Sequence, residues 1–460
     1  MTLRTRHCSL PFAALVAALA MVAGCAGPLP PASPPPASPP AAPSAPATSA
    51  PASTPTPAVP ATAAPVPTTS ATQELIDFLL DVVAQDPTDG LAQRDLGLAL
   101  LQRVRETADP SLYPRAQAAL EAARDLLPDD PLVLAGIGGL LLGRHEFAAA
   151  LKTGQDTLKR FPEYPSARGV VVDALVELGR YEEAFKAAEA YAADSPDLAS
   201  LARLSYAHEL RGDLDAALAA MDQAAASPGL APENTAYVLA LVGQLRRLTG
   251  DPEGAAAAYD QALSLVPDHA PSLAGLGRLA VGRGDLDEAR QRFERAGAIV
   301  PLPEYVIALG ETLEAMGDDA GAQDQYELAA VLITLFKANG VVVDVDLALF
   351  EADHGDAARA LELATAGYAA APTIRAADAT AWALHRLGRD QDASRWSAEA
   401  LRLGSRDPLL RYHAGAIAAA LGEVEDARRD LEAALATDPG FSPTGAAEAL
   451  AILQRLSQAP

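Results

Sequence analysis

Cysteine is almost missing from this sequence of 460 residues, and its two copies, Cys8 and Cys25, both lie near the N-terminus. The remainder of the chain therefore has no residue that could form a disulfide or a thiolate metal site. Basic residues are also scarce, 35 against 60 acidic ones, which gives a net charge of -25. Because nucleic acids and anionic membrane surfaces require clustered Lys and Arg, we expect no nucleic-acid partner.

Signatures of catalysis are missing as well. The sequence has no His-Glu-x-x-His, no paired Cys-x-x-Cys, no Gly-rich phosphate loop and no Gly-x-Ser-x-Gly. We therefore predict a protein that is not an enzyme and has no catalytic residue, no cofactor and no metal. The doubled arginines Arg246-Arg247 and Arg428-Arg429 lie among acidic residues, which is typical of solvated helix faces.

What the sequence does contain is a repeat. Residues 270–301 have the pattern of two short amphipathic helices joined by a turn at Gly284 and ended by Pro301. Gly277 and Ala289 are small enough for the two helices to cross closely. A hairpin of this size cannot bury its apolar stripe alone, so copies of it must stack. A glycine followed five residues later by alanine recurs at intervals of 33 to 38 residues, at Gly143, Gly179, Gly212, Gly250, Gly284, Gly317, Gly355, Gly388 and Gly422.

The set Leu276-Gly277, Ala289, Phe293 and Pro301 resembles the tetratricopeptide repeat pattern, although the leading Trp of that pattern is absent. The resemblance implies an all-α fold, a tetratricopeptide-type α-solenoid of about ten helix-turn-helix repeats. We place the solenoid at residues 91–441, after a covering helix at 73–90 and before a capping helix and tail at 442–460. Residues 329–343 break the pattern, which predicts an overlong helix and a kink, with Val341–Val343 as a possible short strand.

The N-terminal residues look like a targeting segment. Arg4 and Arg6 precede an apolar run from Leu10 to Val22, and the following Val22-Ala23-Gly24-Cys25 resembles the lipobox of bacterial lipoproteins. This implies a signal peptide at residues 1–24 and lipidation of Cys25; the alternative is ordinary cleavage after Ala18-Leu19-Ala20. Residues 26–72 hold 16 prolines and no charged residue, so we predict a disordered linker at 25–72.

By analogy with lipoproteins, Ala26 after the cysteine favours a lipid-anchored protein of the bacterial cell envelope, at the outer membrane and facing the periplasm. The membrane is then a partner through the anchor alone. Relatives of this architecture serve assembly or export, which implies a scaffold that binds a protein or peptide.

In tetratricopeptide repeats the first helix of each hairpin lines a concave groove. The family positions carried onto this chain predict partner-binding residues at Tyr206, Tyr237, Arg247, Arg278, Arg375, Asp378, Trp382, His385 and Tyr412, with Glu209, Gln244, Glu311 and Glu314 on the same face. Aromatic and arginine side chains suit an interface. The alternative is that the aromatic side chains fill gaps between repeats.

A rival function rests on the acidic residues around His354, which run from Asp344 to Asp356. They could serve a metal- or small-ligand-binding protein or an enzyme. The simpler interpretation of Asp353-His354-Gly355-Asp356 is a helix end, a turn glycine and the N-cap of the next helix.

Overall fold

The structure, a computed structural model, describes residues 71–227 and 232–458. The predicted signal peptide, the lipidation site Cys25 and the linker as far as residue 70 lie outside the described residues. Within them the chain forms 22 α-helices and no strand. The possible strand at Val341–Val343 is therefore wrong, because these residues form an irregular connection between two helices.

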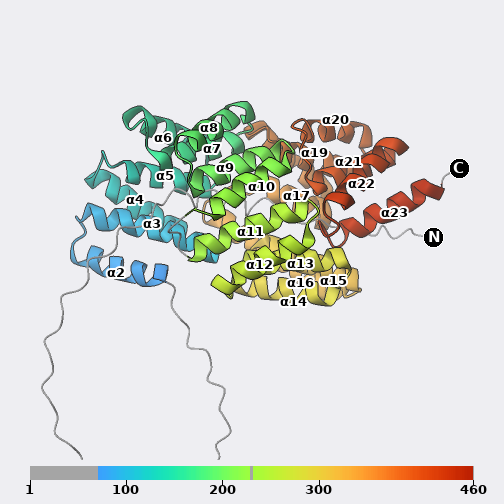
Figure 1. Cartoon of the computed structure of the whole chain (residues 1–460), viewed down its shortest axis with the longest axis horizontal. Helices are drawn as coiled ribbons and strands as arrows, with labels where there is room; N and C mark the ends of the chain where they lie inside the picture. Colours follow the sequence, from blue (N-terminus) through green and yellow to red (C-terminus); the bar gives the residue numbers. More distant parts are fainter. Residues whose placement is uncertain (1–70, 228–231, 459–460) are drawn as a thin grey trace, which may run out of the picture.

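Twenty of the helices pair into ten hairpins stacked in chain order, which confirms the predicted α-solenoid (Figure 1). The hairpins are α3 (Gly90–Thr107) with α4 (Leu112–Leu126), α5 (Pro131–Gly143) with α6 (Phe147–Arg160), α7 (Pro165–Glu177) with α8 (Tyr181–Asp194), α9 (Leu198–Leu210) with α10 (Leu214–Ala225), α11 (Pro232–Leu248) with α12 (Pro252–Leu265), α13 (Ala270–Arg283) with α14 (Leu286–Ile299), α15 (Pro303–Met316) with α16 (Asp319–Ala338), α17 (Asp344–His354) with α18 (Ala357–Ala370), α19 (Ile374–Arg386) with α20 (Asp390–Ala400), and α21 (Pro408–Leu421) with α22 (Val424–Thr437). Helix α2 (Ala71–Gln85) packs on α3, and α23 (Gly445–Gln458) packs on α21 and α22.

Small residues set the distance between the two helices of a hairpin. In the fifth and sixth hairpins a Cβ on Gly243 or Gly277 would lie 2.5 or 2.9 Å from the ring of Tyr259 or Phe293. Ala289 has no exposed surface. The close crossing predicted from Gly277 and Ala289 is therefore present, and the aromatic ring fills the space above the glycine.

Seven of the nine turn glycines have a positive φ, between 68° and 85°, a conformation that a side chain disfavours. The two exceptions correct the prediction. Gly143 is the last residue of α5, and His145 takes the left-handed conformation instead, with φ 60°. Gly143 must still be small, because a Cβ there would lie 2.8 Å from the hydroxyl oxygen of Tyr113. Gly355 has φ -135° and ends α17.

The pattern break at residues 329–343 has the predicted overlong helix. α16 has 20 residues, six more than the 14 of α14, and ends at Ala338. Val341 and Val343 then turn inward and are buried, and α17 begins directly after them at Asp344. Stacking continues, since α17 packs on α18 and α19.

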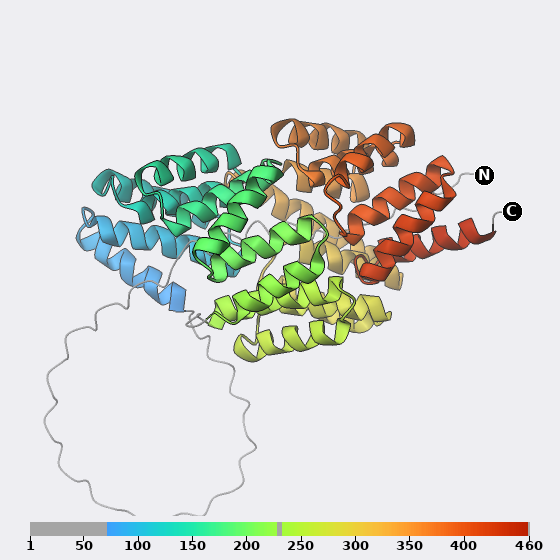
Figure 2. The same cartoon turned by 45° about the horizontal axis from the view of Figure 1, so that its top comes forward.

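The stacked hairpins wind far enough for late repeats to reach early ones (Figure 2). The Val342 N–H donates to the Arg144 carbonyl at 3.1 Å, and the His145 Nδ1–H donates to the Val342 carbonyl at 2.6 Å. The next contact joins the repeat that follows Arg144 to the repeat that follows Val342. In it the Ile374 N–H donates to the Tyr181 hydroxyl at 3.0 Å. We call this line of contacts the seam. It joins the turns at 144–145, 179–181 and 212, and residue 247 near the end of α11, to the connections at 340–342, 372–374, 404 and 438.

None of the helices within residues 71–227 and 232–458 is both long and apolar enough to cross a membrane.

Candidate binding cavity

Between the two sides of the seam lies a cavity of about 590 Å³. On one side it is lined by the C-terminal ends of α7, α9 and α11, by Arg278 of α13 and by the turn at His145. On the other side it is lined by the N-terminal ends of α17, α19 and α21. This volume falls in the range of sites that hold small ligands or short peptide segments. The cavity is therefore the candidate site.

Five of the nine predicted partner-binding residues line this cavity, although they come from four helices. They are Tyr206 of α9, Arg247 of α11, Arg278 of α13, and Arg375 and Asp378 of α19. Glu209 and Gln244, predicted for the same face, line it as well. The structure thus brings together residues that the repeat pattern placed on one concave face.

The other four predicted residues do not line the cavity. Trp382 is 1% exposed, donates its indole N–H to Asp353 at 2.7 Å and stacks on the His413 ring at 4.0 Å. Tyr412 is fully buried and donates its hydroxyl to Glu448 at 2.8 Å. Both aromatic residues fill gaps between repeats, which was the alternative interpretation, so the expectation of an exposed Trp382 and Tyr412 is wrong.

His385 and Tyr237 also point elsewhere. The Nδ1 of His385 lies 2.5 Å from the Asp390 carboxylate, across the turn that joins α19 to α20. The Tyr237 hydroxyl is buried outside the cavity lining. The four predicted residues of α19 therefore fall into two pairs. Arg375 and Asp378 line the cavity, whereas Trp382 and His385 lie away from it.

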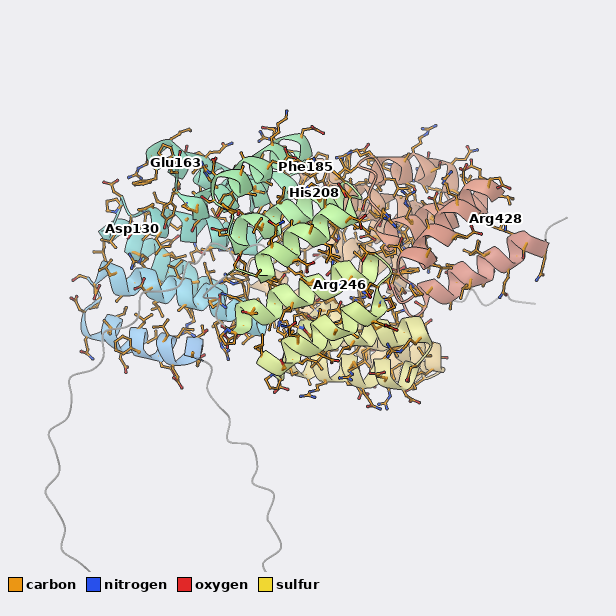
Figure 3. All side chains as sticks on the ribbon, viewed as in Figure 1. Asp130, Glu163, Phe185, His208, Arg246 and Arg428 are labelled. Atoms are coloured by element: carbon orange, nitrogen blue, oxygen red, sulfur yellow. The ribbon has the colours of Figure 1, made fainter. Side chains whose placement is uncertain are left out.

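Two of the cavity arginines form ion pairs across the seam or between neighbouring repeats. Arg375 donates to Asp346 at 2.8 Å, and Arg247 pairs with Asp438. The Arg247 side chain is only 11% exposed, so its assignment to a solvated helix face is wrong. Its neighbour Arg246 points outward and pairs with Asp251, and both Arg246 and Arg428 appear on the face shown in Figure 3.

Two carboxylates in the cavity have no such partner. Glu177 and Glu209 lie at the C-terminal ends of the adjacent helices α7 and α9, and neither forms an ion pair within the described residues. Glu209 accepts only a long hydrogen bond, 3.4 Å, from the Gln244 side-chain amide. Burial, opposed in part by Arg375, raises the pKa of Glu177 to about 7, and burial with the nearby Asp407 raises the pKa of Glu209 to about 7.

The groove positions did not include six acidic residues of the cavity, and two of them, Asp344 and Asp346, had been considered only for the rival function. The other four are Glu146, Glu177, Asp407 and Asp438. Asp407 lies in the connection between the last two hairpins and Asp438 in the connection from α22 to α23, and the family's groove positions include neither. Asp407 caps α21 by accepting from the Leu409 and Leu410 amides. A helix cap before Pro408 was a readable signal, but only the closure of the seam brings it to the cavity.

The acidic residues around His354 do not gather. Asp346 pairs with Arg375, Glu351 pairs with Arg359 at 3.1 Å, and Asp353 is buried against Trp382. Asp356 accepts from the Ala358 and Arg359 amides and caps α18, as the simpler interpretation predicted. In the described part of the chain no three His, Cys, Asp or Glu side chains are arranged to hold a metal ion.

Comparisons with known proteins agree with the repeat pattern. Residues 136–199 and 171–231 match one sequence model described as tetratricopeptide repeat, and residues 247–311 match another with the same description. A search of the curated proteins finds no relative of this chain.

Solved structures that match part of this chain include the human IFIT1 dimer with m7Gppp-AAAA, a tetratricopeptide repeat protein from Parabacteroides merdae, and MamA. Their sequence identities are 15%, 18% and 20%, and their TM-scores are 0.45, 0.32 and 0.28. The matches cover 72%, 56% and 35% of this chain and 77%, 98% and 92% of the three relatives, in the same order. At these values the similarity says nothing about what this chain binds. The sequence-model matches confirm the resemblance for the residues that they cover: segments 136–231 and 247–311 of this chain contain tetratricopeptide repeats.

Proposed function

We propose that this chain is a non-enzymatic scaffold, held by a lipid at Cys25 in the bacterial cell envelope, that binds a protein or peptide partner. The observation that carries the proposal is the cavity, where Tyr206, Arg247, Arg278, Arg375 and Asp378 from four stacked repeats face one space. Tetratricopeptide repeats support a role in protein interaction, and aromatic and arginine side chains are favoured at such interfaces. Glu351, Asp353 and Asp356 make local contacts, so they do not support a metal site or an enzyme at the junction around His354.

Partner binding is tested with the full chain by crosslinking in the native envelope and identifying what co-purifies. Arg278 is the best probe, because it lines the cavity and forms no ion pair with a described residue. Arg278→Ala should lower the recovered partner several-fold. Arg283→Ala is the matched control, since Arg283 ends the same helix, is exposed and pairs with Glu288 outside the cavity. Equal recovery from both variants would place the partner elsewhere.

The anchor is tested separately by fractionation. If lipidation holds the protein at the membrane, Cys25→Ala should move the chain into the soluble fraction, because the acyl chains supply about 0.8 kcal/mol per buried methylene. Mass spectrometry of the N-terminal peptide should also show the acyl chains on the unmodified protein. Retention of Cys25→Ala in membranes would contradict the proposed tether.

A further inference from the structure

The cavity has an excess of negative charge. Eight carboxylates line it against four arginines. Two of the arginines, Arg247 and Arg375, are already engaged by Asp438 and Asp346. Asp378 lies 2.8 Å from the His413 ring, and Asp407 accepts from backbone amides. Glu146 pairs with Arg144 at 3.3 Å outside the lining, whereas Asp344, Glu177 and Glu209 form no ion pair within the described residues. Of these three, Glu177 and Glu209 lie at the C-terminal ends of neighbouring helices.

The surroundings of these two glutamates are unfavourable for a negative charge. Both are half-buried, so each charge is partly removed from water. Both also lie at helix C-termini, where the macrodipole repels a negative charge. Folding would gain stability from an uncharged side chain at either place. A cation bound between the two carboxylates would offset both the partial desolvation and the unfavourable helix dipoles.

The surroundings of the two carboxylates indicate what such a cation would look like. Tyr206 lines the cavity together with both glutamates, and burial and their negative charges raise the pKa of its hydroxyl. Leu178, Leu210, Leu248 and Ile374 contribute apolar surface to the same lining. A bare metal ion would gain nothing from an aromatic ring and aliphatic walls, whereas an alkyl ammonium group would contact both kinds of surface.

We infer that the cavity binds a protonated amine on an apolar body, with the ammonium group held between Glu177, Glu209 and Tyr206. Two sources share this chemistry: a free alkyl diamine, and a lysine side chain of a peptide segment. The lysine source rests on the proposed scaffold function, whereas the diamine source does not require a partner protein.

The test is calorimetric titration of the purified full chain at pH 8 and about 0.15 M salt, where nonspecific attraction to an acidic surface is screened. The probes are 1,8-diaminooctane and the capped pentapeptide Ala-Ala-Lys-Ala-Ala. The neutral control is 1,8-octanediol, which has the same alkyl body. We expect saturable binding of one amine probe per chain and none of the diol.

Two variants identify the site. Glu177→Gln and Glu209→Gln should each weaken binding about tenfold, as expected for one charge-assisted hydrogen bond, and should leave the fold intact because the amide has the same shape. Glu182→Gln is the matched control, since Glu182 is exposed on α8 outside the cavity lining. Thermal unfolding of all three variants checks the fold.

Binding should also weaken between pH 8 and pH 6, because both carboxylates take up protons there. The charged groups that act on Glu177 and Glu209 from the surrounding helices are Asp173, Tyr206, Arg247, Asp346, Arg375 and Asp407. Asp173 is itself engaged by Arg203 at 2.6 Å, and the pair is buried. Burial still raises the pKa of Asp173 to about 6, so Asp173 adds to the change at the acidic end of this interval.

Each outcome separates the inference from the scaffold proposal. Tighter binding of the diamine than of the lysine peptide supports a small-molecule site, and the reverse supports a partner's lysine; both support the amine site. The inference is overturned if no amine binds, if the diol binds as tightly as the diamine, or if Glu177→Gln and Glu209→Gln bind like the unchanged chain. Partner capture in the envelope could still succeed in that case.

Discussion

Two groups of turn glycines distinguish the turns at the seam from the turns away from it. Gly250, Gly284 and Gly317 have positive φ, and a Cβ on any of them would meet no atom within 4 Å. Gly179 and Gly212 have the same conformation, yet a Cβ would collide with the carbonyl oxygens of Pro372 and Gly404. The turn glycine of a repeat therefore has one role away from the seam, which is to form the turn. At the seam it has a second role, because its lack of a side chain also allows a distant connection to pack against it.

The largest effect is expected from breaking the seam at both of its glycines. Gly179→Ala with Gly212→Ala adds the left-handed penalty of about 1–2 kcal/mol per residue and also a collision at each site. The chain should unfold at lower temperature and expand, which small-angle X-ray scattering measures as a larger radius of gyration.

The matched control for that experiment is Gly250→Ala with Gly284→Ala. It carries the same conformational penalty without the collision, so the chain should lose some stability and keep its radius. If both double variants expand equally, the seam does not hold the two halves together.

A smaller effect is expected from Tyr181→Phe. The hydroxyl of Tyr181 accepts the buried Ile374 N–H, and removing it leaves that donor unsatisfied at a cost of about 1–3 kcal/mol. Hydrogen exchange of the Ile374 amide should accelerate. Tyr326→Phe provides the comparison, because the Tyr326 hydroxyl donates to Glu314 inside one hairpin. Unchanged exchange at Ile374 in Tyr181→Phe would contradict the contact.

The smallest effect is expected from pH. Burial raises the pKa of Glu177 and Glu209 to about 7 and that of Glu304 to about 8, so the folded chain binds more protons than the unfolded chain near neutral pH. Stability should therefore fall as pH rises from 6 to 8. Burial lowers the pKa of His269 to about 4, which acts in the opposite sense only below about pH 6.5.

Thermal unfolding between pH 6 and pH 8 measures this dependence. The double variant Glu177→Gln with Glu209→Gln should be more stable than the unchanged chain at pH 8 and should show a flatter profile. A midpoint that rises with pH over this interval would show that the cavity carboxylates are not the dominant groups.

The sequence predicted the hairpins because their signals are local. A turn glycine, an alanine at the crossing and a terminating proline act within about 17 residues, and ten hairpins follow from their repetition. Gly143 failed as a turn because His145 two residues later adopts the left-handed conformation, where its ring donates to Val342. That contact joins residues 197 apart in the chain.

The cavity was only half predictable for the same reason. The groove positions supplied Tyr206, Arg247 and Arg375, because each belongs to the inner face of its own repeat. They could not supply Asp407 or Asp438, which reach the cavity only through the summed rotation of many stacked hairpins. Trp382 was assigned wrongly to the binding surface, because an aromatic residue on an inner helix can pack against a neighbouring repeat or contact a ligand. Here it packs between repeats, and its indole N–H donates to Asp353.

The seam also changes how this molecule should come apart. An open stack of hairpins can lose its end units one at a time, as each contacts only its neighbours. Here Arg144, Tyr181 and Arg247 tie the second, third and fifth hairpins to segments that lie more than 190 residues later. Once unfolding from either end reaches one of these hairpins or its distant partner, it must disrupt both, so this solenoid should unfold more cooperatively than an open stack.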